Sequence, residues 1–510
     1  MQNLYRSAAV VTVFALFEHF LGFLYRIILS RLLGPEGLGV YQVALTVFAV
    51  FLTISSSGLP ITLSRVISKH RAKNSLKGEQ SATTAAILIS LMFSVPITLL
   101  LFFFRTPFST IFSDPRCADL FYILIFGLSL TSVYAIIRGS FWGNKRFFAY
   151  SVIELIEEII MIGVGVFLLL GISSGVADVN KAAIAVLVSY ICSFTIAIIY
   201  YFVKGGKFRS PKGEFLPLLK SSLPVTAMRT SSSLMNSLIS VVFPMRLMAA
   251  GFSSSKALAE YGVVCGMVMP VLMTPGSFIG SLAVVLVPTL AECYYRKQTE
   301  EVGGLVEKAI GTTLLIACLL IPFFLSCGEN VGIFLFSNAE SGIMLRNCAL
   351  VLLPMSITMI TTSLLNSMNC ERQTLFIFLF GSAAMLLCVW FLPAYLGSGA
   401  LLVGMAADYC ITAVCSLVLL KKKAGKLCSL KTILRIALAT LPAAGVGIGL
   451  KTVLMLCLDY VSATILVIFA VALLEVLLLW ACRFIDLKQI CRKIFSRIFR
   501  KKSKKARAHS

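Results

Sequence analysis

Charged residues are scarce in this 510-residue sequence and make up only 13% of it. Soluble globular proteins contain about a quarter charged residues, whereas here 58% of the residues are hydrophobic and the mean hydropathy is +0.94. This composition is that of an integral membrane protein. It excludes most soluble enzyme classes, and it leaves no room for a sizeable soluble domain.

Metal-ligand patterns are also missing from the sequence. The three histidines, His19, His70 and His509, lie far apart and belong to no ligand motif. The 15 cysteines are scattered, and no two of them have C-x-x-C spacing. We therefore expect no disulfide framework, no metal site and no cofactor.

Long apolar runs predict fourteen membrane-spanning helices, because a hydrocarbon core of roughly 30 Å takes about 20 apolar residues per helix. The expected fold class is therefore all-α and polytopic. Pro270, Pro275 and Gly276 interrupt the eighth run, which we interpret as one bent span. The predicted spans are 8–30, 39–64, 84–104, 119–141, 152–170, 182–203, 221–245, 257–291, 309–327, 347–366, 375–392, 399–420, 432–457 and 462–482.

Lysine and arginine predict the orientation, because cytoplasmic loops of membrane proteins carry the excess of these residues. When the N-terminus is placed inside, most of the 45 basic residues fall in loops on the cytoplasmic side. We expect a multi-pass protein of the plasma membrane with both termini in the cytoplasm. The net charge of +23 is then mostly a topology signal, and no nucleic-acid partner is expected.

Basic and apolar residues alternate at helical spacing in the tail, 483–510. This pattern favours an amphipathic helix on an anionic inner leaflet, with a solvated tail as the alternative.

An internal repeat divides the chain. Laying Pro60 onto Pro288 also lays the segment at Arg138 onto the segment at Asn366, at matching places in the order of spans. The match predicts two parallel six-span lobes, and repeats of this kind hold a substrate near the membrane midplane and work by alternating access. The predicted parts are lobe 1–220, lobe 221–430, two extra spans in 431–482 and the tail.

Three segments resemble a known family. Residues 26–42 read RIILSRLLGPEGLGVYQ, and residues 138–143 and 153–158 read RGSFWG and IELIEE. They are similar to the stage V sporulation protein B group of oligosaccharide and polysaccharide flippases. That group lies in the superfamily that also holds the lipid II flippases and the multidrug and toxin extruders (MATE). The resemblance implies two six-helix lobes forming a V around a central cavity.

The resemblance also implies a function. The chain would flip a lipid-linked saccharide or peptidoglycan precursor, of the undecaprenyl-pyrophosphate type, from the inner to the outer leaflet for cell-wall or spore-cortex synthesis. The expected partners are this substrate, membrane lipids and cell-wall synthesis proteins, and no residue is expected to be catalytic. Two alternatives stay open: a cation-coupled exporter of drugs or small molecules on the same fold, and a membrane-embedded glycosyl or acyl transferase.

Ionisable residues inside spans are functional candidates, because inserting them costs several kcal/mol unless they face the bundle interior or water. A charged stripe in the first span and a polar face of the seventh fit a cavity for a pyrophosphate, with arginine as the phosphate ligand. Pairing within the first span and helix packing in the seventh are the alternatives. The expected substrate-binding residues are Glu18, His19, Arg26, Arg229, Ser233 and Asn236.

A second group of charges begins the fifth span. Glu154, Glu157 and Glu158 lie close in sequence to Arg138 and Arg146. We expect a local ion-pair cluster here that closes the cytoplasmic side, with Arg138 and the three glutamates as its candidate residues and compensation of the helix dipole as the alternative.

Overall fold

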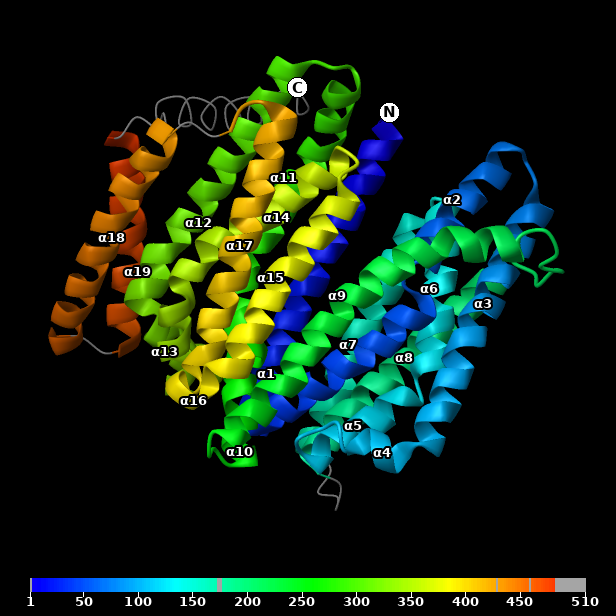
Figure 1. Ribbon diagram of the computed structural model, residues 1–510, viewed down its shortest axis with the longest axis horizontal. Coiled ribbons are helices and arrows are strands. Elements are labelled where there is room, and N and C mark those ends of the chain that lie inside the picture. Colours follow the sequence, from blue (N-terminus) through cyan, green and yellow to red (C-terminus); the bar gives the residue numbers. More distant parts are fainter. Residues whose placement is uncertain (1, 172–176, 428–429, 458–459, 482–510) are drawn as a thin grey trace, which may run out of the picture. The chain divides into compact units, whose positions relative to one another are not determined.

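The computed structural model describes residues 2–171, 177–427, 430–457 and 460–481 (Figure 1). These residues form helices joined by short turns, and none of them lies in a strand. The expected all-α class is therefore confirmed. The predicted amphipathic tail lies outside the described residues.

Eleven helices in the described part of the chain are long and apolar enough to cross a membrane. The count is twelve when the bent pair α5 (Pro115–Ile125) and α6 (Leu128–Gly143) forms one span. The predicted fourteen differs for two reasons. Helix α1 (Gln2–Ser56) takes in most of two predicted spans, and α7 (Phe147–Gly171) contains three glutamates that lower its apolar character. Fourteen spans therefore stay a prediction.

A kink divides α1 between the two spans that the sequence predicts there. Gly34 has φ 68° and ψ 178°, a conformation that glycine adopts at little cost, and Pro35 follows it. A second break at Ser57 and Gly58 ends α1, and α2 (Leu59–Ala72) begins with Pro60 in its first turn.

The chain forms two compact units. Unit 1 comprises Met1–Val271, Leu335–Ser337 and Glu371–Thr412. Within it α7 packs along α8 (Asp178–Val203), and α2 packs with α3 (Leu76–Phe103) and α6 around Leu63, Ile67 and Phe141 (Figure 1). Besides α1, α2, α5, α6 and α7, its helices are α3 (Leu76–Phe103), α4 (Arg105–Ser109), α8 (Asp178–Val203), α9 (Phe215–Ala249), α10 (Ser254–Tyr261), the π-helical η1 (Gly262–Val268), α15 (Glu371–Phe391) and α16 (Pro393–Leu396).

Close backbone contact joins α1 to η1 within unit 1. A Cβ atom on Gly39 would overlap the carbonyl of Leu258, and one on Gly262 would overlap the carbonyl of Pro35. Only glycine allows this approach at either position. The predicted eighth span, 257–291, is helical throughout, because α10, η1 and α11 follow one another without a gap. Its helical geometry changes at the π-helical segment η1, shortly before Pro270.

Unit 2 comprises Leu272–Phe334, Asn338–Cys370 and Ala413–Ser510. Its α18 (Leu430–Cys457) and α19 (Tyr460–Ala481) form a helical pair at the place of the two extra predicted spans. Glu329 accepts hydrogen bonds from Arg346 Nη1 at 2.9 Å and Lys451 Nζ at 2.8 Å, which joins α12, α13 and α18. The helices are α11 (Met269–Tyr295), α12 (Thr299–Phe336), α13 (Ala339–Cys348), the 3₁₀ turn η2 (Ala349–Val351), α14 (Leu352–Ser367), α17 (Gly399–Ala424), α18 (Leu430–Cys457) and α19 (Tyr460–Ala481). Helices α11, α12 and α17 contribute residues to both units.

The predicted lobe boundaries follow the sequence repeat, whereas the units follow spatial contacts. The boundaries at residues 220 and 430 therefore stay a prediction.

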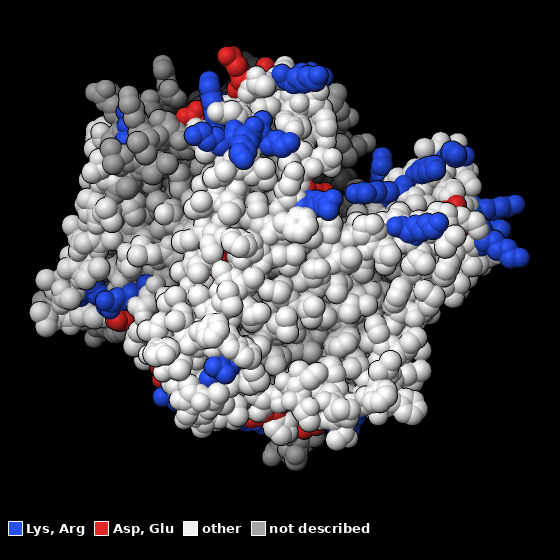
Figure 2. All heavy atoms as spheres, in the orientation of Figure 1, with Lys and Arg blue, Asp and Glu red and all other residues white. Residues whose placement is uncertain are grey.

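Uncharged side chains cover most of the visible surface, and lysine and arginine gather at helix ends (Figure 2). Many large apolar side chains are exposed, among them Phe103 at 85% and Leu456 at 86%. Exposed apolar surface on this scale is suited to contact with lipid. Together with the apolar helices, it identifies a multi-pass membrane protein.

Candidate functional site

A cavity of about 360 Å³ lies among α1, α2, α6, α7 and α9 in unit 1, with Tyr190 of α8 at its wall. We call it the charged cavity, because its lining is rich in ionisable side chains. Those side chains are Glu18, Arg138, Glu154, Glu157, Glu158 and Arg229. Polar and aromatic residues complete the lining, among them Thr53, Ser56, Ser57, Tyr134 and Trp142.

The break between α1 and α2 forms one wall of this cavity. The freed N–H of Gly58 donates a hydrogen bond to Thr226 Oγ1 of α9 at 3.2 Å. Arg229 follows Thr226 by three residues, so the two share a face of α9. The break thus holds α9 in the position that brings Arg229 to the cavity.

Arg138 of α6 and Glu154 of α7 form an ion pair in the lining of the charged cavity. The Nη1 atom of Arg138 lies 2.8 Å from Glu154 Oε1, and the two side chains are 31% and 13% exposed. The guanidinium also lies 5.3 Å from the centre of the Trp142 ring and 5.9 Å from that of Tyr150. Two aromatic faces and one carboxylate therefore fix the orientation of Arg138.

The charged stripe of α1 faces α7. A Cβ atom on Gly22 would lie 3.1 Å from Glu158 Oε1, so this carboxylate packs directly against α1. Glu18 lies one turn before Gly22 and Arg26 one turn after it. Glu158 is therefore flanked by an acidic and a basic side chain of α1, and it interacts electrostatically with Arg26.

Four predicted substrate-binding residues do not line the charged cavity. His19 and Arg26 are exposed on α1, Asn236 is exposed on α9, and Ser233 is half-buried. Of the predicted six, only Glu18 and Arg229 line it. The four residues predicted as an ion-pair cluster all line it, and Arg138–Glu154 is the direct pair among them. Their roles in binding and gating stay predictions.

The sequence reasoning missed the aromatic wall formed by Tyr134, Trp142 and Tyr190. Aromatic residues are common in apolar spans, and no spacing distinguishes those at a cavity from those facing lipid. The RGSFWG segment was the available signal, because it places Trp142 one turn after Arg138.

Carboxylates outnumber guanidinium groups in the lining of this cavity, four glutamates against two arginines. The sequence reasoning emphasised arginine as a ligand for pyrophosphate, and the structure adds a strongly acidic side to the same space. This space can therefore hold anionic groups at its arginines and cationic groups at its glutamates.

A second ion cluster joins α1, α5 and α10 at another part of unit 1. Arg116 donates hydrogen bonds to Glu36 and to both carboxylate oxygens of Asp114, and Ser254 donates to Asp114 Oδ2 at 3.0 Å. The Asp114 side chain is 8% exposed. Hydrogen bonds from the Arg116 side chain hold the pKa of Asp114 below its ordinary value. We call these four residues the Arg116 cluster.

Long apolar helices that surround a cavity lined by charged side chains are typical of a membrane transporter. The family model for "Polysaccharide biosynthesis protein" matches residues 4–294. The chain belongs to this family, and the resemblance drawn from the sequence is confirmed.

Two curated relatives come from Bacillus subtilis (strain 168). Stage V sporulation protein B is 23% identical over 363 residues, which are 68% of this chain and 69% of that protein. Lipid II flippase MurJ is 21% identical over 364 residues, 66% of this chain and 65% of that protein.

Two solved structures share the fold. The inward closed conformation of the lipid II flippase MurJ has a TM-score of 0.71 at 16% identity and covers 92% of this chain and 98% of that chain. An inward-facing multidrug resistance MATE transporter has a TM-score of 0.67 at 17% identity, covering 80% and 94%. The family membership and the two curated relatives, together with this shared fold, identify the chain as a membrane flippase or transporter rather than an enzyme.

Proposed function

We propose that this chain flips a lipid-linked saccharide or peptidoglycan precursor, of the undecaprenyl-pyrophosphate type, from the inner to the outer leaflet by alternating access. Family membership and the relation to a lipid II flippase support the substrate class. A pyrophosphate cannot cross hydrocarbon unpaired, so a flippase for such a lipid needs cationic groups inside its membrane-spanning part.

The main support for this proposal is an arginine, Arg229, that is unpaired among the described residues and lies in the lining of the charged cavity. It lines the charged cavity and is exposed to it, and no carboxylate among the described residues forms an ion pair with it. Arg138, by contrast, is paired with Glu154. Arg229 is therefore free to pair with a phosphate, while Arg138 and the glutamates hold the cavity wall and form its gate.

Reconstitution tests the substrate class directly. The purified chain is placed in liposomes that contain an undecaprenyl-pyrophosphoryl saccharide, and an impermeant sugar-modifying reagent measures how much substrate appears outside. We expect protein-dependent exposure of the sugar. Equal exposure in protein-free liposomes would contradict the proposal.

The acidic lining favours a second candidate, a cation-coupled exporter of cationic small molecules. Four glutamates around one cavity attract cations, and an arginine offers a cationic drug no contact. The two candidates differ in what a reconstituted vesicle moves. Transport of a lipophilic cationic dye without any flipping of the lipid-linked saccharide would select the exporter.

We place the chain in the plasma membrane with both termini in the cytoplasm. The basic loop 204–212 then faces inward and the turn at 253–255 faces outward. In a cysteine-free background, we expect a cysteine at 253–255 to react with an impermeant maleimide in intact cells, and one at 204–212 to react only after permeabilisation. Reaction in the opposite order would reverse the orientation. Cell-wall synthesis partners and a role in spore cortex stay predictions.

With this orientation the Arg116 cluster lies at the outer face, where it joins α1, α5 and α10. Arg116→Ala leaves the largely buried Asp114 without its charged donor, which costs about 1.5–3 kcal/mol when the hydrogen bonds are charge-assisted. We expect roughly tenfold faster maleimide labelling, from outside, of a cysteine placed at Thr53 in the charged cavity. Lys256→Ala on α10 is the matched control and should label at the unmodified rate.

The pKa of Asp114 gives this test a pH control. Because that pKa is lowered below its ordinary value of about 3.9, the stabilisation by the carboxylate is present above pH 4 and is lost only at lower pH. The effect of Arg116→Ala should therefore be equal at pH 5.5 and pH 8. A labelling difference that disappears at pH 5.5 would show that another group controls the opening.

A further inference from the structure

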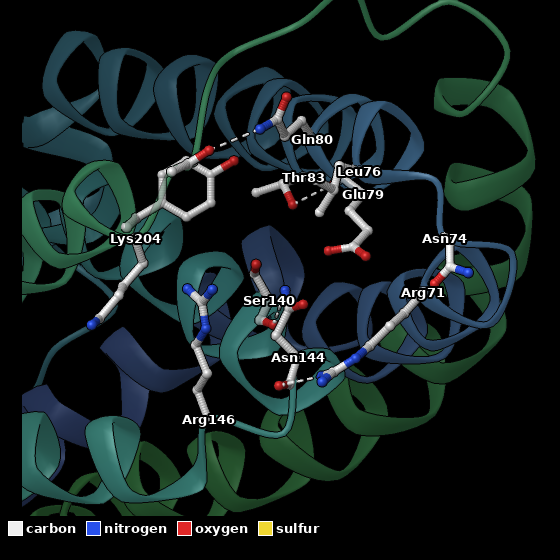
Figure 3. Close-up of a pocket in the computed structure, with 13 residues that line it drawn as sticks. Arg71, Asn74, Leu76, Glu79, Gln80, Thr83, Ser140, Asn144, Arg146 and Lys204 are labelled. Atoms are coloured by element: carbon white, nitrogen blue, oxygen red, sulfur yellow. Dashed lines mark hydrogen bonds between the residues drawn. The ribbon is translucent and has the colours of Figure 1, made fainter.

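A second cavity, of about 440 Å³, lies at one end of α2, α3, α6 and α8 in unit 1 (Figure 3). Its residues belong to the segments at which these helices begin or end, and it shares no lining residue with the charged cavity. We call it the basic pocket. Its volume falls within the roughly 300–1,000 Å³ typical of small-molecule sites.

Three cationic residues line the basic pocket. Arg71 donates a hydrogen bond to the backbone carbonyl of Asn144, and Lys204 lies over the ring of Tyr200 at 5.6 Å. Arg146 is half-buried, and its guanidinium has no ion-pair partner in the described part of the chain. None of these three cations forms an ion pair with a carboxylate of the described residues.

Glu79 is the one carboxylate in the lining of this pocket. It is only 9% exposed, yet it forms no ion pair and its carboxylate no hydrogen bond with any described residue. Figure 3 shows the Glu79 carboxylate and the Arg146 guanidinium pointing from opposite walls toward one open space. One carboxylate and one guanidinium that face the same pocket, neither of them in an ion pair with a described residue, fit a ligand that carries both a positive and a negative group.

Apolar surface adjoins the pocket. Leu76 lines it and is 70% exposed, and Phe202 and Val203, directly before Lys204, are 45% and 74% exposed. In a membrane protein, exposed apolar side chains beside a polar pocket provide a place for acyl chains. The pocket therefore combines contacts for a headgroup with a surface for a lipid tail.

We propose that the basic pocket binds an aminoalkyl phosphate, the chemistry of a phosphoethanolamine headgroup. The phosphate pairs with Arg146 and Arg71, and the ammonium pairs with Glu79. A zwitterionic membrane phospholipid and a free phosphoethanolamine both carry this chemistry. The basic pocket shares no lining residue with the charged cavity, so this proposal does not depend on which substrate the transporter moves.

Native mass spectrometry of the purified full chain tests this site with phosphatidylethanolamine and phosphatidylglycerol at matched concentrations. We expect at least fivefold tighter binding of phosphatidylethanolamine, because only its headgroup supplies an ammonium to Glu79. Glu79→Gln, which keeps the shape of the side chain, should remove this preference. Arg146→Gln should weaken the binding of both lipids.

Lys77→Gln is the matched control, because Lys77 is exposed on α3 and does not line the pocket. It should leave both affinities unchanged. Equal binding of the two lipids to the unmodified chain, or a preference that Glu79→Gln leaves intact, would overturn the proposal. Arg146→Lys keeps the charge with little risk to folding, and it should retain more binding than Arg146→Gln.

A second experiment distinguishes a membrane phospholipid from a soluble ligand of the same chemistry. The thermal stability of the detergent-purified chain is measured with soluble phosphoethanolamine, inorganic phosphate and ethanolamine. If phosphoethanolamine raises the melting temperature while inorganic phosphate and ethanolamine do not, the result supports a soluble ligand. Binding of phosphatidylethanolamine without an effect of phosphoethanolamine supports a lipid whose acyl chains contribute. Binding of neither contradicts the site.

Discussion

Arg229→Ala should lower the rate of precursor flipping at least about tenfold, while the protein still inserts and folds. A charge-assisted contact between arginine and phosphate is worth about 1.5–3 kcal/mol, and 1.4 kcal/mol corresponds to a factor of ten. No carboxylate among the described residues pairs with Arg229, so its removal leaves no buried charge without a partner. The rate is measured in the reconstituted assay described above.

Two further variants show what the arginine contributes. Arg229→Lys keeps the charge but loses the two-pronged donor geometry, so its rate should lie between those of the unmodified chain and Arg229→Ala. Lys220→Ala removes an exposed cation from the same helix outside the charged cavity, and it should flip at the normal rate. An Arg229→Ala variant that flips at the normal rate would remove this residue from the substrate path.

Arg138→Leu should destabilise the protein strongly, because it leaves Glu154 charged, largely buried and unpaired. Breaking a buried ion pair from one side costs about 3–5 kcal/mol. At roughly 2–4 °C per kcal/mol, this predicts a loss of about 6–20 °C in the apparent melting temperature. Size-exclusion chromatography of heated, detergent-purified protein measures the loss.

The double variant separates stability from transport. Replacing Arg138 and Glu154 together by leucine removes both charges, and exchanges of this kind are often neutral for stability. We expect the double variant to recover most of the melting temperature but not the flipping rate, because the gate needs both charges. Recovery of both properties would show that the pair is structural only.

The sequence predicted most of the helices because hydrophobic length is a direct physical requirement of the bilayer. It also separated the helical segments on either side of Gly34, since Gly-Pro in an apolar run interrupts regular helix. It did not predict the π-helical segment at 262–268. Nothing in the residue pattern of that apolar run distinguishes a π-helical turn from an ordinary α-helical one.

The candidate site was predictable in its charges more than in its geometry. Glu18, Arg138 and Arg229 stood out because charge inside a span is rare. His19 and Arg26 share a helix with Glu18 but do not line the cavity, since a stripe on one helix does not show which part of it a neighbour covers. Arg138 has three glutamates near it in sequence, and only the packing of α6 on α7 shows that Glu154 is its ion-pair partner.

The contact between Gly39 and Gly262 has a consequence for how this sequence can diverge. A side chain at Gly39 is excluded by the backbone carbonyl of Leu258, and one at Gly262 by that of Pro35, so both positions face backbone rather than flexible side chains. A larger residue at either position would push the two helices apart. No substitution at the other position can compensate, because glycine is already the smallest residue there. These two positions therefore cannot change by single substitutions in evolution. A related sequence can carry a larger residue there only if α1 and η1 lie farther apart.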